Sequence, residues 1–284
     1  MKECLLADRI GEIRIFISLF QEAIMYHLEK DKRYEGIFIG LEFSILFFLI
    51  SFLVNLVIKG TLWFVFSSAL RFAFGVWILI VARKVYGKTV KDIINFRGSK
   101  VALFAGIGFI VYFFYYLFAA CLGVKAVTGL SAGLLFAQIF LQQLTTGFYE
   151  ELNFRFLMVE GYFYGEKNLR NKLFYCLLNF VIFGAIHLIG GNIASFFATG
   201  AIGFVFAVMY IKSRNILIPM IFHFVYDIMA NLMGYAEWRN TKVFETVNYF
   251  FIWVFVAMVI FSFLILIKKG EKEVDYSTSM ADII

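Results

Sequence analysis

The sequence predicts an all-α polytopic membrane protein, a bundle of about eight transmembrane helices with an N-terminal amphipathic helix at the membrane interface. Hydrophobic residues make up 62% of the 284 residues, charged residues only 16%, and the mean hydropathy is +0.84. A soluble domain contains about a quarter charged residues and could not bury this much apolar surface. The composition therefore excludes an ordinary soluble protein.

Eight apolar runs are long enough to cross a bilayer, because about 20 helical residues at ~1.5 Å each span the hydrocarbon core. The runs cover residues 36–58, 62–82, 101–124, 131–163, 173–191, 193–211, 216–236 and 246–267. The fourth run is interrupted by acidic residues, and the fifth and sixth could also form one hairpin around Gly190-Gly191-Asn192.

The distribution of Lys and Arg predicts the orientation of these spans. With both termini in the cytoplasm, 20 of the 26 basic residues lie on the cytoplasmic side, 4 lie on the other side, and Arg71 and Arg155 lie within spans. This asymmetry follows the positive-inside rule. We therefore expect cytoplasmic segments at 1–35 and 269–284 around a membrane domain at 36–268. The net charge of +6 then reflects this topology and the anionic lipid headgroups of the bilayer, and no nucleic-acid partner is expected.

The N-terminal segment has an apolar stripe at helical spacing, with polar residues opposite. The stripe consists of Ile10, Ile13, Ile17, Phe20, Ile24 and Leu28. Such a pattern is typical of an amphipathic helix lying on the membrane surface. The segment has neither a clean apolar core nor a small-residue cleavage site, so we expect no cleavable signal peptide. The three cysteines are scattered and predict neither a disulfide framework nor a metal site.

The fourth span contains two adjacent acids and an arginine, in the stretch "TTGFYEELNFRF" at 145–156. Charges at membrane depth cost several kcal/mol and usually mark a functional site. Glu151 and Arg155 are four residues apart, so they can pair on one helix face. Glu150 is rotated by about 100° from Glu151 and has no cation one turn ahead. We interpret Glu151 as a structural acid and Glu150 as the acid available to act as a general base.

Two of the three histidines, His187 and His223, lie inside apolar spans, whereas His27 lies in the N-terminal segment. A single buried histidine can simply bond a neighbouring carbonyl, but two histidines with an intramembrane acid pair are residues that activate water or bind metal. Asp227 lies four residues after His223 and can fix the tautomer of its imidazole. Pro219, the only proline, predicts a kink in the seventh span.

The depths of these residues, estimated from helix length, do not all agree. At ~1.5 Å per residue, Glu150 and His187 lie about 20 Å from the inner ends of their spans, whereas His223 lies only about 10 Å deep. Tilt or the predicted kink could absorb the difference. Arg71, in the second span, is expected to cap a polar pocket or to snorkel to the surface.

Three motifs on apolar helices, in this order, resemble the CPBP intramembrane proteases. They are Glu150-Glu151-x-x-x-Arg155, Phe183-x-x-x-His187 and His223-x-x-x-Asp227. This family comprises the type II CAAX prenyl endopeptidases and bacterial Abi or bacteriocin-processing relatives. The resemblance covers about residues 130–236 and implies an eight-helix membrane bundle.

The resemblance also implies roles for the site residues Glu150, Glu151, Arg155, His187, His223 and Asp227. Glu150 and His187 would activate the hydrolytic water, while His223 and Asp227 would support the oxyanion or bind a metal. Two positions depart from the family pattern. Phe156 follows the arginine where Gly is usual, which would narrow the site. Asp227 stands where Asn is frequent, and an ionised Asp cannot donate a hydrogen bond.

The sequence therefore predicts an intramembrane endopeptidase that hydrolyses a membrane-associated peptide or protein, either prenylated or of a leader type. Two other classes stay open: a proton-coupled transporter, since Glu, His and Arg also form proton relays, and a catalytically silent scaffold or immunity protein on the same fold.

Two chemistries stay open as well. Glu150, His187 and His223 could supply three ligands for a catalytic divalent ion such as zinc. In a metal-free route, Glu150 would be the base and His223 would stabilise the oxyanion.

Overall fold

The computed structural model describes the chain except for residues 1–33, 95, 97–98, 163–167, 189–190 and 269–284. The helices of the described residues are α2 (Glu35–Asn55), α3 (Thr61–Tyr86), α4 (Ser99–Ala105), α5 (Ile107–Gly123), α6 (Ala132–Leu134), α7 (Gln143–Glu150), α8 (Met158–Tyr162), α9 (Leu169–Leu188), α10 (Ile193–Ser213), α11 (Leu217–Met233) and α12 (Thr241–Ile267). The predicted amphipathic helix and the predicted cytoplasmic tail fall on residues outside the described ones.

Five described helices, α2, α3, α9, α10 and α12, are long and apolar enough to cross a membrane. A sixth span results if α4 and α5, which meet at a bend of 53°, are counted together. The all-α polytopic class is therefore confirmed, whereas the count of eight spans is not. The other two predicted spans are helical too, but α11 has only 17 residues and the segment at 132–162 carries charged residues and is divided by π-helical turns.

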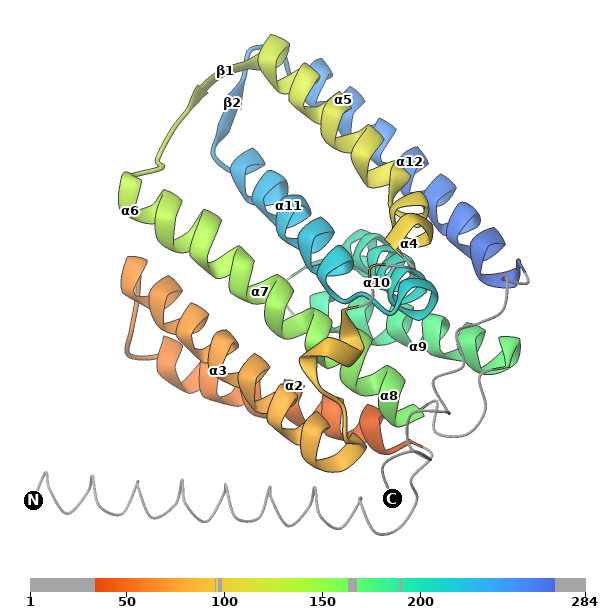
Figure 1. The fold of residues 1–284 in the computed structure, drawn as a ribbon. Coiled ribbons are helices and arrows are strands. Elements are labelled where there is room, and N and C mark those ends of the chain that lie inside the picture. The colour runs from red at the N-terminus through yellow and green to blue at the C-terminus, as the bar shows by residue number, and fades with distance from the viewer. Residues whose placement is uncertain (1–33, 95, 97–98, 163–167, 189–190, 269–284) are drawn as a thin grey trace, which may run out of the picture.

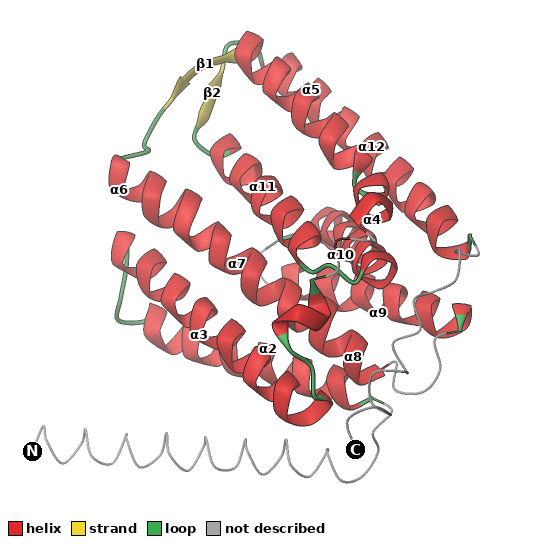
Figure 2. Cartoon of the chain, in the orientation of Figure 1, coloured by secondary structure: helices red, strands yellow, loops and turns green. Residues whose placement is uncertain are grey.

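The long helices run side by side, so that their ends gather at two opposite ends of the bundle (Figures 1 and 2). At one, the hairpin end, β1 (Val124–Val127) pairs antiparallel with β2 (Ala236–Trp238), with Val124 opposite Trp238. At the other, α3 and α12 end and α9 and α11 begin. We call this the basic end, because it holds Lys84, Lys88, Lys212, Arg214 and Lys268.

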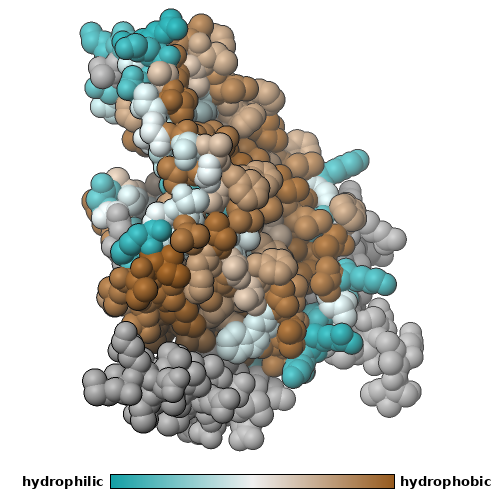
Figure 3. All heavy atoms as spheres, turned by 90° about the vertical axis from the view of Figure 1, so that its left-hand side faces the viewer, coloured by the Kyte–Doolittle hydropathy of each residue, from teal (hydrophilic) through white to brown (hydrophobic). Residues whose placement is uncertain are grey.

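The outside of the bundle is strongly apolar. Large hydrophobic side chains are exposed along α2, α3, α5 and α12, among them Ile45, Phe52, Phe114 and Trp253. Figure 3 shows that hydrophobic residues cover most of the described part of one face, while hydrophilic residues gather towards its margins. An exposed apolar surface of this extent would aggregate in water but suits the hydrocarbon of a bilayer. The structure therefore supports an integral membrane protein.

The centre of the bundle is α10, which packs against α9, α4 and α12. Every residue from Gly200 to Ser213 except Lys212 is buried. Gly203 lies where an added Cβ would meet the backbone carbonyl of Asn179 in α9, so the missing side chain permits the two helices to approach closely. This helix forms one wall of the candidate site.

The kink predicted at Pro219 does not occur. Pro219 is the third residue of α11, and α11 runs unbroken from Leu217 to Met233. A proline in the first turn of a helix has no intrahelical N–H bond to lose, so it is tolerated there without a bend. Among the described helices the sharp break lies instead at Gly106, between α4 and α5.

Candidate active site

The candidate active site is built on a rod of consecutive helices from Ala132 to Tyr162, which joins α6, α7 and α8 through two π-helical turns. Glu150 is the last residue of α7. Glu151 is the first residue of the second π-helical turn, which ends at Leu157. π-Helical turns within α-helices are frequent at functional sites. The two acids thus lie at a change of helical geometry.

A glycine brings α11 against this rod. A Cβ added at Gly147 would lie 3.2 Å from the carbonyl oxygen of Met220 and 3.7 Å from the Cβ of His223. Since real Cβ atoms rarely make contacts of 3.2 Å with backbone oxygen, only glycine allows α7 and α11 to lie so close without adjustment. This approach places His223 beside Gly147, which lies one helical turn before Glu151 on the rod.

The start of α11 explains the disagreement between the estimated depths. Asn215, just before α11, is only 1% exposed and forms an isolated β-bridge with Ile94. Arg214, the residue before Asn215, pairs with Glu160 of α8, so the start of α11 lies beside the end of the rod. Glu151 and His223 each lie nine residues from this contact, and His223 Nδ1 is 2.7 Å from Oε1 of Glu151. The two residues are therefore level with each other, although the depths counted from the predicted span ends differ.

Glu151, Arg155 and His223 form a buried ion cluster. Arg155 Nη1 lies 3.2 Å from Oε1 of Glu151, which confirms the predicted pairing. The same oxygen accepts the hydrogen bond from His223 Nδ1. The side chains of Glu151 and Arg155 are completely inaccessible to solvent. Glu151 therefore has a second role that helix spacing did not predict, because it also orients the imidazole of His223.

Glu150 and Asp227 face the other nitrogen of His223. The Nε2 atom lies 3.7 Å from Oε2 of Glu150 and 3.4 Å from Oδ2 of Asp227, so the predicted contact between His223 and Asp227 is present. The side chains of the two acids are 17% and 18% exposed. Oε2 of Glu150 is buried and has no hydrogen-bond partner in the described part of the chain. Of the adjacent acids Glu150 and Glu151, only Glu150 therefore has a side chain that water can reach.

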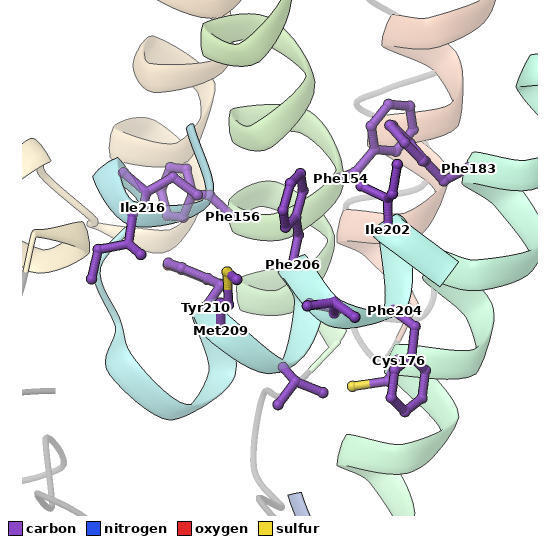
Figure 4. Close-up of a cluster of buried hydrophobic side chains, with 14 of the residues drawn as sticks. Phe154, Phe156, Cys176, Phe183, Ile202, Phe204, Phe206, Met209, Tyr210 and Ile216 are labelled. Carbon is purple, nitrogen blue, oxygen red and sulfur yellow. The ribbon is translucent and has the colours of Figure 1, made fainter. Parts of the chain in front are cut away.

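Aromatic rings enclose the guanidinium of Arg155. It lies 4.4 Å from the ring centroid of Phe183, 5.4 Å from that of Phe206 and 5.9 Å from that of Phe154. The same Phe183 and Phe206 rings contact the ring of His223, at 5.9 and 5.7 Å. Figure 4 shows these three phenylalanines among buried side chains of the rod, α9 and α10. Each cation–π contact contributes roughly 0.5–2 kcal/mol, which helps to offset the cost of burying the charge.

His187 lies near the site but does not join the ion cluster. It is the penultimate residue of α9, and its Nδ1 lies 2.7 Å from the carbonyl oxygen of Phe183. Its ring packs on Phe183 at 4.7 Å. Among the described residues, His187 makes no hydrogen bond or ion pair with Glu150. The carbonyl fixes the ring and leaves Nε2 available for water.

The three residues predicted as possible metal ligands, Glu150, His187 and His223, do not form a metal-binding geometry. The described residues include no group of three or more His, Cys, Asp or Glu side chains placed to hold a metal ion. A catalytic zinc site needs three protein ligands around one point. The side chains in this arrangement do not fit that requirement.

Asn153 is a residue of the site region that the sequence did not single out. It is completely buried, and its Nδ2 donates hydrogen bonds to the Gly40 carbonyl, at 3.0 Å, and to the Ser44 hydroxyl, at 2.9 Å. These bonds tie the rod to α2, far away in the sequence. A polar Asn within an apolar span could have indicated this role, but the charged neighbours Glu151 and Arg155 are the more conspicuous residues of the segment.

A buried acid–histidine cluster in a helical membrane bundle occurs in intramembrane hydrolases and also in proton relays. Comparison with protein families favours the first: residues 131–229 match the family described as "Type II CAAX prenyl endopeptidase Rce1-like". The match covers about a third of the chain, and it confirms the predicted resemblance to the CPBP proteases. The match includes all six predicted site residues. Searches of curated proteins and of solved structures gave no match.

Proposed function

We propose that this protein is an intramembrane endopeptidase in which Glu150 activates water to hydrolyse a peptide bond of a membrane-associated substrate. The observation that carries the proposal is the unequal environment of the two acids. Glu151 uses its Oε1 for both Arg155 and His223 and its side chain is inaccessible to solvent, whereas the side chain of Glu150 is 17% exposed. A general base must be reachable by water and free to accept its proton.

The geometry of His223 supports a role at the oxyanion. Its Nδ1 faces Glu151, and its Nε2 faces Glu150 and Asp227, so both ring nitrogens point at carboxylates. This arrangement favours the imidazolium form, in which both nitrogens donate. In the proposed step, water gives a proton to Glu150 while its oxygen attacks the carbonyl carbon. The Nε2–H of His223 then stabilises the oxyanion. Asp227 holds the imidazole, a role that an ionised carboxylate can fulfil.

We assign His187 to the positioning of the water. Its Nδ1 lies on the Phe183 carbonyl, which directs the other ring nitrogen away from the backbone. A histidine held in this way can hold a water molecule without touching the base directly. As the tetrahedral intermediate collapses and the C–N bond breaks, Glu150 gives its proton to the leaving amine, which regenerates the Glu150 carboxylate.

The similarity to type II CAAX prenyl endopeptidases makes prenylated peptides the first substrates to test. Purified protein in proteoliposomes would be given a fluorogenic peptide with a prenylated cysteine, and the same peptide with a free cysteine. Mass spectrometry would identify the cleavage products. Cleavage that is lost in Glu150→Gln supports the proposal. Proton-coupled uptake of a solute without any cleavage would contradict it.

We also propose that the basic end faces the cytoplasm. The ends of α3, α10 and α12 and the start of α9 place most of the described Lys and Arg residues there, whereas the hairpin end carries Lys59, Lys125, Arg239 and Lys242. This asymmetry supports an orientation with the basic end inside. In a variant whose native cysteines are replaced, Lys88→Cys should react with an impermeant thiol reagent only from the cytoplasmic side, and Lys125→Cys only from the other.

A further inference from the structure

Arg71, in the middle of α3, is a charged residue near the site that lies outside the segment with family similarity. Its Nη1 donates hydrogen bonds to the hydroxyl of Ser67 and to the Ser67 carbonyl, the latter at 3.4 Å. Its guanidinium lies 4.9 Å from the ring centroid of Phe47. Its Nε is buried and has no hydrogen-bond partner in the described residues. One edge of the guanidinium is thus anchored, while Nε is left unpaired.

The charges of the site show why a second cation is needed. Arg155 is committed to Glu151. Glu150 and Asp227 both face the same Nε2 atom of His223, at 3.7 and 3.4 Å, and those are their only ion pairs among the described residues. One ring nitrogen cannot compensate two carboxylates. Like charges so close together in an apolar environment repel each other strongly.

Arg71 is a second cation on this side of the site. Its guanidinium packs on Phe47, the Phe47 ring lies 4.9 Å from the ring of Tyr149, and Tyr149 directly precedes Glu150, while α3 packs along α7. A charge acts over longer distances in the low-dielectric interior of a membrane protein than in water. The sequence predicted that Arg71 caps a polar pocket or snorkels, and its contacts with Ser67 and Phe47 favour the first of these.

We propose that Arg71 is a positioning residue of the active site, whose positive charge offsets the neighbouring carboxylates of Glu150 and Asp227. The inference rests on the proposed function. It adds to the site a residue from a helix that lies outside the region of family similarity. Arg71 would not touch the reacting atoms, and its contribution would depend on its charge and on the presence of Asp227.

The test is a double-mutant cycle on peptide cleavage in proteoliposomes. Arg71→Met removes the charge and keeps most of the side-chain volume, and Arg71→Lys restores the charge. Both are made in the wild-type protein and in Asp227→Asn. Arg83, exposed three turns further along the same helix, gives the matched controls Arg83→Met and Arg83→Lys. Melting temperatures report on folding separately.

We expect Arg71→Met to lower kcat by about tenfold or more with little change in KM, and Arg71→Lys to recover most of that loss. In the Asp227→Asn background, the loss from Arg71→Met should shrink to less than about threefold, because one of the two competing charges is gone. The Arg83 variants should behave as wild type.

Equal losses in both backgrounds, or equal losses in the Lys and Met variants, would overturn the proposal and indicate a packing role alone. Wild-type activity retained in Arg71→Met would also overturn it while leaving the proposed function intact. If the wild-type protein cleaves none of the peptides tested, the proposed function fails first. The two failures are therefore distinguishable.

Discussion

Glu150 and Glu151 are neighbours in the sequence but belong to two different environments. The Glu151 side is sealed: the acid, Arg155 and the Nδ1 face of His223 are packed against aromatic rings. The Glu150 side is partly open, and its two carboxylates share a single imidazole nitrogen. The difference teaches that one position along a helix separates an ion cluster that stabilises the fold from an acid that can do chemistry. His223 touches both sides and couples them.

The largest effect should come from the open side. Glu150→Gln keeps the shape of the side chain but removes the base, so we expect kcat to fall by about 10²–10⁴-fold. The melting temperature should change little, because Glu150 makes only a long contact with His223. Glu237→Gln, on an exposed strand at the hairpin end, is the control. A Glu150→Gln protein that unfolds would show that both sides of the site are structural.

The sealed side should respond in the opposite way. Arg155→Ala leaves Glu151 buried with only His223 as a partner, and breaking a buried ion pair costs about 3–5 kcal/mol. We expect a lower yield of folded protein and a lower melting temperature, measured in detergent against Arg170→Ala, an exposed arginine at the start of α9. If the remaining folded Arg155→Ala protein has the wild-type kcat, the role of Arg155 is limited to stability. A stable but inactive Arg155→Ala would contradict it.

A smaller effect should follow from a change that moves α11, with His223, away from α7. Gly147→Ala adds a Cβ that meets the Met220 carbonyl, so α11 must shift by a few tenths of an ångström and carry His223 with it. Displacements of this order at a catalytic group are costly, and we expect a loss of about tenfold in kcat/KM with a modest change in melting temperature. Gly133→Ala, whose added Cβ would find only ordinary contacts at 3.9 Å, is the matched control. Wild-type activity in Gly147→Ala would show that the spacing of α7 and α11 is not critical.

The smallest effect is expected from removal of metal. Because Glu150, His187 and His223 do not converge on one point, cleavage should persist within about twofold after treatment with a chelator. Elemental analysis of the purified protein accompanies the assay. Stoichiometric zinc that is lost together with activity, and that restores activity when it is added back, would reject the metal-free route. It would also require His187 to move towards the acids.

The sequence predicted the helical membrane class and the residues of the site well, because both depend on local patterns. Charges within apolar runs identified Glu150, Glu151 and Arg155, and spacing of four residues identified the contacts of Arg155 and of Asp227. The link between Glu151 and His223 joins positions 72 residues apart, and no local pattern encodes such a contact.

Other features were missed for physical reasons that are equally specific. Pro219 breaks a helix only in the helix interior, and its place in the first turn depends on where Asn215 starts α11. The π-helical turns change which side chains of the rod share a face, and no particular amino-acid composition marks where such turns occur. The place of Arg71 near the site depends on the packing of α3 beside α7, which no local pattern encodes.

The burial of α10 also has a consequence for how the chain assembles. Its sequence is apolar enough to be stable in lipid by itself, yet in the finished protein its second half contacts only other helices. The first half keeps exposed apolar side chains such as Ile193 and Phe197, so only the second half exchanges lipid for protein when the bundle assembles. We expect the wall that α10 gives the site to form only once α12 and the rod pack against that second half, so assembly of the bundle and assembly of the site are one event.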